Sequence, residues 1–119
     1  MRIAGAGGGL YSTVEDLSIF NHALKSYEII SKESAERMFE NQFEISAGAY
    51  SGYGIILEYK EYCGKLRRIN YHPGGGPGVR ALNAYYPDDN LDITAISNVN
   101  DRDTFNTVIK EIEAILLTK

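Results

Sequence analysis

Apolar residues first recur with a helical period near the N-terminal end of the chain. Four of them fall on one helix face: Val14, Leu17, Phe20 and Leu24. Just before this stripe, Ser12 with Glu15, or Thr13 with Asp16, forms a capping box that would satisfy the first free backbone N–H groups. His22 lies on the polar side of the same helix, where a solvated surface histidine is expected. The pattern predicts an amphipathic helix that begins near residue 13.

Two further helices are indicated by caps and apolar spacing. Ser31 is placed to cap a shorter helix that runs to about Phe39, with Ala35 and Met38 turned inward. Near the C-terminal end, Asp101 or Asp103 precedes the clearest amphipathic pattern in the chain. Its stripe consists of Phe105, Val108, Ile109, Ile112, Ile115 and Leu116. We expect this last helix to lie flat against a sheet.

Between the helical regions the hydrophobic period changes to two, which is typical of half-buried strands. The alternation predicts strands at about residues 53–59, 65–72, 79–86 and 91–98, with turns at Cys63-Gly64 and at residues 87–90. The last of these has apolar residues on both faces and is expected to be covered on both sides. The sequence thus predicts one α+β domain over residues 1–119: an antiparallel sheet of about four strands, two N-terminal helices and a C-terminal helix packed on the sheet.

Composition narrows the functional classes. The 119 residues are enough for one core, and the net charge of −4 argues against nucleic acid as a partner. Lys65, Arg67 and Arg68 form a small basic cluster, interpreted as a solvated strand edge. Cys63 is the single cysteine, which rules out an internal disulfide and a cysteine-rich metal site and leaves the cellular compartment open. The sequence predicts no metal and no cofactor.

The segment from His72 to Arg80, HPGGGPGVR, is the most unusual local feature. Pro73 cannot donate a hydrogen bond to a neighbouring strand, so this part of the strand should be an edge. The pleat puts His72 on the face opposite Ile69 and Tyr71. A polar histidine beside glycine N–H groups could bind a substrate carbonyl or an oxyanion. The alternative is a glycine-rich hairpin connection with a surface histidine.

Several segments resemble one family, in the same order along the chain. Residues 8–17, GGLYSTVEDL, are similar to the GGLYSTAEDL segment of serine β-lactamase-like hydrolases, a family that includes class C β-lactamases, DD-peptidases and related esterases. Residues 31–34 with Met38, residues 53–55, and residues 86–100 resemble later landmarks. Residues 72–78, HPGGGPG, resemble the third catalytic motif, written Lys-Thr-Gly or His-x-Gly. The resemblance implies the C-terminal portion of a β-lactamase-like fold.

The resemblance also implies roles for particular residues. His72 would orient the substrate or tune the proton network, and Gly74 would let the substrate approach the backbone. Gly75 N–H would be one oxyanion-hole donor, while Gly76 and Arg80 would contact the substrate. The family's nucleophile motif, Ser-x-x-Lys, does not occur in the sequence, and neither does Tyr-x-Asn or Ser-x-Asn. We therefore expect this chain to be inactive alone.

Three hypotheses follow. In the first, the chain is part of a serine hydrolase whose full-length form acts on a β-lactam, a D-Ala peptide or an ester; the histidine in place of lysine favours a peptidase or esterase. In the second, it is a non-catalytic interaction module. The family's two N-terminal strands continue the sheet beyond the last strand, so without them residues 91–98 would form an unpaired edge, and we expect a homo-oligomer. The third, an independent enzyme that uses His22 or His72, has no identifiable serine partner.

Overall fold

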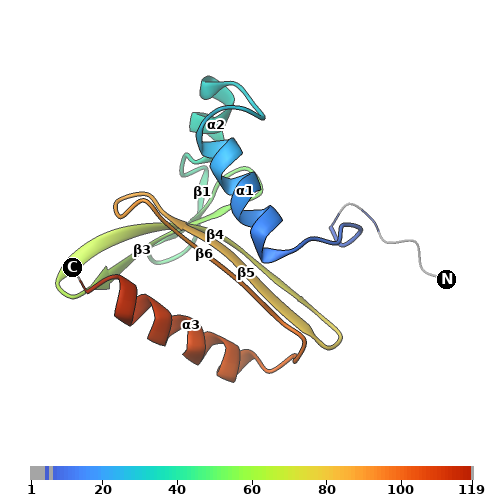
Figure 1. The fold of residues 1–119 in the computed structure, drawn as a ribbon. Helices are drawn as coiled ribbons and strands as arrows, with labels where there is room; N and C mark the ends of the chain where they lie inside the picture. Colours follow the sequence, from blue (N-terminus) through green and yellow to red (C-terminus); the bar gives the residue numbers. More distant parts are fainter. Residues whose placement is uncertain (1–4, 6, 119) are drawn as a thin grey trace.

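Six antiparallel strands lie side by side in the order in which they occur along the chain (Figure 1). The computed structural model describes residue 5 and residues 7–118. The elements are α1 (Val14–Lys25), α2 (Lys32–Met38), β1 (Phe43–Ser46), β2 (Ala49–Ser51), β3 (Ile56–Tyr62), β4 (Lys65–Gly76), β5 (Val79–Tyr86), β6 (Leu91–Ser97) and α3 (Arg102–Leu116). The predicted α+β class and the antiparallel sheet are confirmed.

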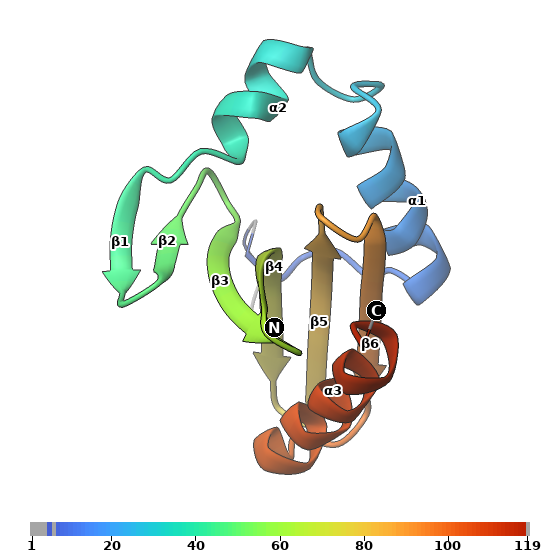
Figure 2. The same cartoon turned by 90° about the vertical axis from the view of Figure 1, so that its left-hand side faces the viewer.

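The helices cover opposite faces of the sheet. Helix α3 crosses one face, whereas α1 and α2 lie over the other (Figures 1 and 2). Because side chains alternate along a strand, each central strand contributes every second residue to the α3 face. That face holds the buried core: Ile69, Ala84, Tyr86, Ile93, Ile109 and Leu117. The sheet thus separates an apolar layer under α3 from a more polar layer under α1.

The helix starts agree with the predicted caps. Thr13 Oγ1 accepts a hydrogen bond from Asp16 N at 3.1 Å, so Thr13 and not Ser12 is the cap of α1. Ser31 caps α2. Asp101 caps α3 by accepting hydrogen bonds from the backbone N–H groups of Asp103 and Thr104. Side-chain oxygens therefore satisfy the first N–H groups of all three helices.

The strand prediction was incomplete in two places. The sheet has six strands and not four, because the hairpin of β1 and β2 was missed. Phe43 and Ile45 alternate with Glu44 and Ser46 in β1, but the run is only four residues long and all four side chains are exposed. In addition, β4 continues through the glycines to Gly76, where the sequence analysis ended the strand at about residue 72. Glycine weakens a strand but does not prevent it when a neighbouring strand supplies the hydrogen bonds.

Burial differs from the predicted pattern at three places. On α3, Val108, Ile115 and Leu116 are exposed, whereas Glu113 is buried. Strand β6 is not covered along its whole length, since Ile96 remains 49% exposed. The predicted solvated edge is also wrong for Arg67, which is 1% exposed.

Among the residues that the structure describes, no helix combines the length and the apolar character of a membrane span.

Candidate functional site

Half of β4 has a free edge. Strand β3 pairs with β4 only from Lys65 to Tyr71, whereas β5 pairs with it as far as Gly76. Within the described part of the chain, residues 72–76 therefore have a strand partner on one side only. This confirms the edge predicted from Pro73, whose missing N–H would leave a gap in a central strand.

His72 stands on this edge segment, on the face that α1 covers. Its Nδ1 lies 2.9 Å from the carbonyl oxygen of Pro73. The carbonyl can only accept, so Nδ1 carries the proton and donates it to the oxygen. In the neutral ring, Nε2 is then left with a free lone pair. The imidazole can then accept a hydrogen bond from a hydroxyl or amine group.

A groove of about 200 Å³ separates α1 and α2 from the sheet beside His72. Its walls combine apolar helix residues with polar sheet residues. They are Phe20, Asn21, Leu24 and Lys25 of α1, Met38 and Phe39 at the end of α2, Gly54 and Ile55 before β3, and Asn70, His72, Asn83, Ala84 and Tyr85 of the sheet. The groove is shallow because Phe20 remains 46% exposed and His72 is exposed.

The glycines in and after β4 allow the β4–β5 hairpin to pack and turn as it does. A Cβ added at Gly74 would lie 3.2 Å from Cβ of Ala81 on the paired strand, which is closer than ordinary packing distance. At Gly78 the backbone has a φ of 75°, a left-handed conformation that the β4–β5 turn requires and that glycine adopts without strain. Glycine at these two positions therefore supports the hairpin that carries His72.

The predicted site residues divide between the two faces of the sheet. Arg80 pairs with Gly75 across the ladder, and its side chain belongs to the α3 face. Gly74 also borders the cavity on that side. His72 belongs to the α1 face. A ligand that reached both His72 and Arg80 would have to extend around the free edge of β4.

A polar network that the sequence analysis missed connects α1 with the sheet under this groove. Asn21 and Asn83 exchange two amide hydrogen bonds, of 2.6 and 2.8 Å. Lys25 forms a salt bridge of 2.7 Å with Asp92 and lies 3.8 Å from the centre of the Tyr85 ring. The spacing of Asn21 and Lys25, four residues apart and therefore on one helix face, was the available signal. The network fixes the helix wall of the groove relative to β5 and β6, and β5 pairs with the strand that carries His72.

Across the part of the chain that the structure describes, no group of three or more His, Cys, Asp and Glu side chains is arranged to hold a metal ion. The polar residues that line the groove are His72, Asn21, Asn70, Asn83, Lys25 and Tyr85.

The α+β fold with its antiparallel sheet is similar to part of a penicillin-binding protein, and the likeness is one of fold. One similar solved structure is a penicillin-binding protein from Bacillus halodurans, with a TM-score of 0.73 and 23% sequence identity. The match covers 87% of this chain but only 30% of that protein. No protein-family model matches the sequence, and no curated protein is similar enough to match.

Proposed function

We propose that this chain forms one wall of the active site of a serine hydrolase related to β-lactamases and penicillin-binding proteins. The free edge of β4 would bind the backbone of an acyl-D-Ala peptide or a related ester or β-lactam. The observation that carries the proposal is the one-sided pairing of residues 72–76 next to the groove under α1. An unpaired strand edge can bind an extended ligand by main-chain hydrogen bonds.

In this proposal His72 is a proton acceptor or hydrogen-bond acceptor and not the nucleophile. With Nδ1 held by the Pro73 carbonyl, Nε2 would accept a proton or a hydrogen bond from the reacting group. Gly75 N–H would donate to the developing oxyanion. The attacking hydroxyl is expected to come from a Ser-x-x-Lys segment that these 119 residues do not contain. The chain alone would therefore bind ligand without acylation.

The experiment is a titration of the ¹⁵N-labelled chain with N-acetyl-D-Ala-D-Ala, followed by NMR. We expect saturable shifts of the amide signals of Gly74, Gly75 and Gly76. Replacing His72 with alanine removes one hydrogen bond, so His72→Ala should weaken binding by about 2- to 10-fold. His22→Ala is the matched control, because His22 is also exposed but lies on α1 outside the groove lining. Unchanged spectra at millimolar peptide would refute the proposal.

The absence of acylation can be measured separately. Intact mass after incubation with a fluorophosphonate, and with a penicillin, should show no covalent adduct on the isolated chain. A stoichiometric adduct on one serine would show that the chain carries its own nucleophile.

A second function is favoured by the opposite end of the sheet. Strand β6 is the last strand in the order, so in the described residues its outer side has no strand partner. An open edge of seven residues can pair with another chain. On this alternative the chain is an interaction module that associates through β6.

A further inference from the structure

A second cavity lies on the other face of the sheet, between α3 and strands β4 and β5. It encloses about 360 Å³, which is within the size range of small-molecule sites. One wall is apolar and is formed by Ile69, Phe105 and Ile109. The cavity shares the edge segment of β4 with the groove beside His72 but opens on the opposite side. Its argument does not depend on the function proposed above.

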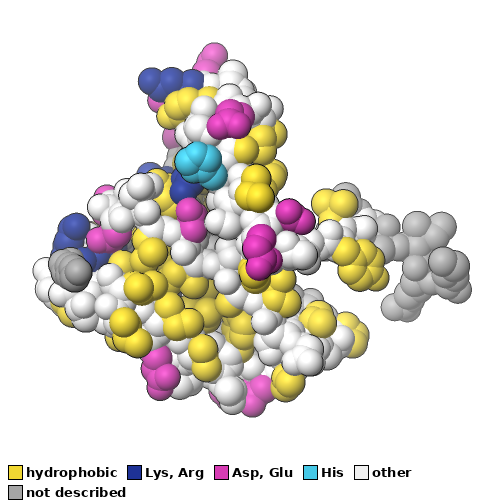
Figure 3. All heavy atoms as spheres, in the orientation of Figure 1, with side chains coloured by type: hydrophobic (Ala, Val, Ile, Leu, Met, Phe, Trp, Pro, Cys, Tyr) yellow, Lys and Arg dark blue, Asp and Glu magenta, His cyan; other side chains and the backbone are white. Residues whose placement is uncertain are grey.

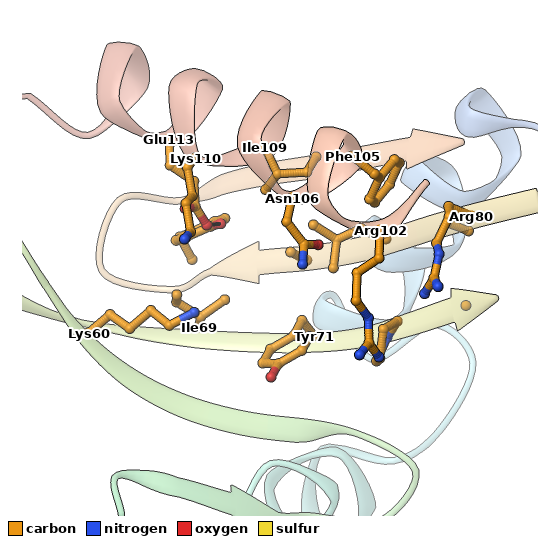
Figure 4. A pocket seen from close by; sticks show the side chains of 16 residues that line it. Lys60, Ile69, Tyr71, Arg80, Arg102, Phe105, Asn106, Ile109, Lys110 and Glu113 are labelled. Carbon is orange, nitrogen blue, oxygen red and sulfur yellow. Dashed lines mark hydrogen bonds between the residues drawn. The ribbon is translucent and has the colours of Figure 1, made fainter. Parts of the chain in front are cut away.

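Four cationic side chains line this cavity, against a single carboxylate. Figure 4 shows Arg80 and Arg102 reaching toward one end, and Lys60 and Lys110 lying at the other end near Glu113. Glu113 already accepts hydrogen bonds from two tyrosine hydroxyls. Such an excess of positive charge is unusual in a chain whose net charge is −4.

The arginine end carries the least neutralised charge. Lys60 has Glu58 as an ion-pair partner at 3.1 Å. Neither Arg80 nor Arg102 forms a salt bridge within the described residues. Nε of Arg80 is buried and has no hydrogen-bond partner in the described structure. A buried donor without an acceptor destabilises the folded chain unless an acceptor is supplied.

Asp101 is an acidic residue that interacts electrostatically with Arg80. Its pKa is lowered mainly by hydrogen bonds from Thr104, with Arg80 as a minor cause. Asp101 uses its carboxylate to cap α3, where it accepts from the backbone and the hydroxyl of Thr104. The cap therefore does not supply the acceptor that the Arg80 guanidinium lacks.

We propose that this cavity binds a small organic oxyanion, a carboxylate or phosphate monoester with an apolar group. The oxyanion would lie between Arg80 and Arg102, because guanidinium groups bind planar and tetrahedral oxyanions by paired hydrogen bonds. The apolar group would lie against Phe105 and Ile109. The low-dielectric wall strengthens the charge interaction and favours an amphipathic ligand over a bare ion.

The test is calorimetric titration of the chain with phenyl phosphate at low ionic strength. We expect one binding site per chain, and weaker binding of inorganic phosphate, which lacks the apolar group. Arg80→Gln and Arg102→Gln should each weaken binding by about ten-fold or more, because each removes a charged hydrogen-bond donor. Arg37→Gln on α2 is the matched control, since Arg37 is exposed and lies outside this cavity.

A second pair of variants tests the cavity and not only the charge. Asn106→Trp would fill the space while keeping all four cations and should abolish binding of phenyl phosphate. Thr107→Trp, on the next residue of α3 and outside the lining, should leave it intact. Arg102 is exposed, so Arg102→Gln remains informative even if Arg80→Gln fails to fold. The proposal is overturned if no saturable heat is seen, or if both arginine variants or Asn106→Trp bind as the parent chain does.

Discussion

The Arg67 side chain is buried and hydrogen-bonded at one end of the sheet. Its position in an alternating strand, between charged residues, predicts an exposed side chain. Its Nε donates to Asp89 at 2.9 Å, and Nη1 donates to the carbonyl oxygen of Tyr62 at 2.7 Å. The side chain is 1% exposed, whereas that of Asp89 is 19% exposed. The guanidinium thus connects the end of β3 with the β5–β6 turn. A single sequence does not reveal this burial, because the partner is 22 residues away and becomes adjacent only when the strands pair.

Removing the Arg67 side chain should be among the most destabilising substitutions. Arg67→Ala leaves Asp89 and a strand-end carbonyl without their donor, and breaking a buried ion pair costs about 3–5 kcal/mol. Lys65→Ala is the control, because Lys65 lies 4.0 Å from the same carboxylate but is 55% exposed and should contribute less than about 1 kcal/mol. Urea denaturation of both variants measures the difference. Equal losses of unfolding free energy would contradict the assigned role of Arg67.

Glu113 and two tyrosines form a buried cluster under α3. The hydroxyl of Tyr62 donates to Glu113 at 2.7 Å, and that of Tyr86 donates to the other carboxylate oxygen. Burial, followed by the hydrogen bond to Glu113, raises the pKa of Tyr62 and of Tyr86 well above the ordinary value of 10.0. The cluster also explains the wrong face prediction for α3: two phenol donors allow a carboxylate to take a place that an apolar stripe would have filled.

These pKa shifts predict a loss of stability at high pH. In the unfolded chain both phenols would lose their protons near pH 10, whereas in the folded protein they retain them. The unfolded state therefore binds fewer protons above pH 10, and the free energy of unfolding falls as the pH rises further. Denaturation at pH 8, 9.5 and 10.5 should show this decline, and Tyr86→Phe should reduce its slope. A constant unfolding free energy up to pH 11 would contradict it.

At the scale of elements, the sequence predicted the helices and strands that have a local signal and missed the segments whose strand structure depends on pairing with a neighbour. The three helices were predicted because caps and a 3.6-residue period are local signals. Strands β3 to β6 followed from alternation: β5 has the predicted bounds, and the bounds of the other three differ from the prediction by at most four residues. Hairpin β1–β2 was missed because its strands have only four and three residues, although Phe43 and Ile45 do alternate with polar residues. The glycine part of β4 was missed because it has no side-chain pattern and is a strand through its pairing with β5. At the candidate site, the edge was predicted from Pro73, but the amide pair of Asn21 and Asn83 beneath it was not.

The docking of α1 depends on the amide pair between Asn21 and Asn83. Asn21 is 8% exposed, so truncating either residue leaves its partner's amide with unsatisfied groups in a nearly closed space. Asn21→Ala and Asn83→Ala should each cost about 1–3 kcal/mol of unfolding free energy. The double variant should cost clearly less than the sum, because the second truncation removes the unpaired group that the first created.

Chemical denaturation of the two single variants and the double variant measures the coupling. Ser18→Ala is a suitable control, since Ser18 is an exposed residue of the same helix. Strictly additive losses would mean that the two amides do not hold α1 on the sheet, and that the helix wall of the groove is positioned by Lys25 and Asp92 instead.

At the scale of the whole molecule, apolar side chains remain at the surface of both helical layers. In the view of Figure 3, apolar side chains are visible in both the upper and the lower part of the molecule. The largest exposed fractions on α1 and α3 are those of Ile19 at 66% and Ile115 at 73%. Just before α1, Leu10 and Tyr11 are also exposed. Apolar surface of this kind marks contact sites for other protein segments.

The outer edge of β6 could pair with the same edge of a second copy of the chain. β1, at the other end of the sheet, has only four residues, and short edge strands resist pairing. β6 has seven residues and an exposed Ile96. We therefore expect two copies to pair edge to edge through β6, giving a particle of twice 13.2 kDa in light scattering after size exclusion.

Two lysine substitutions separate pairing through β6 from nonspecific apolar contact. Ile96→Lys places a charge on the edge strand, which opposes pairing, so it should convert the dimer to a monomer. Ile115→Lys removes a more exposed apolar side chain on α3 and should leave the dimer intact. If only Ile115→Lys dissociates it, the α3 face is the interface, and the free β6 edge is not what holds the copies together. A parent chain that stays monomeric at high concentration excludes both interfaces and leaves the β4 edge as the binding edge of the sheet.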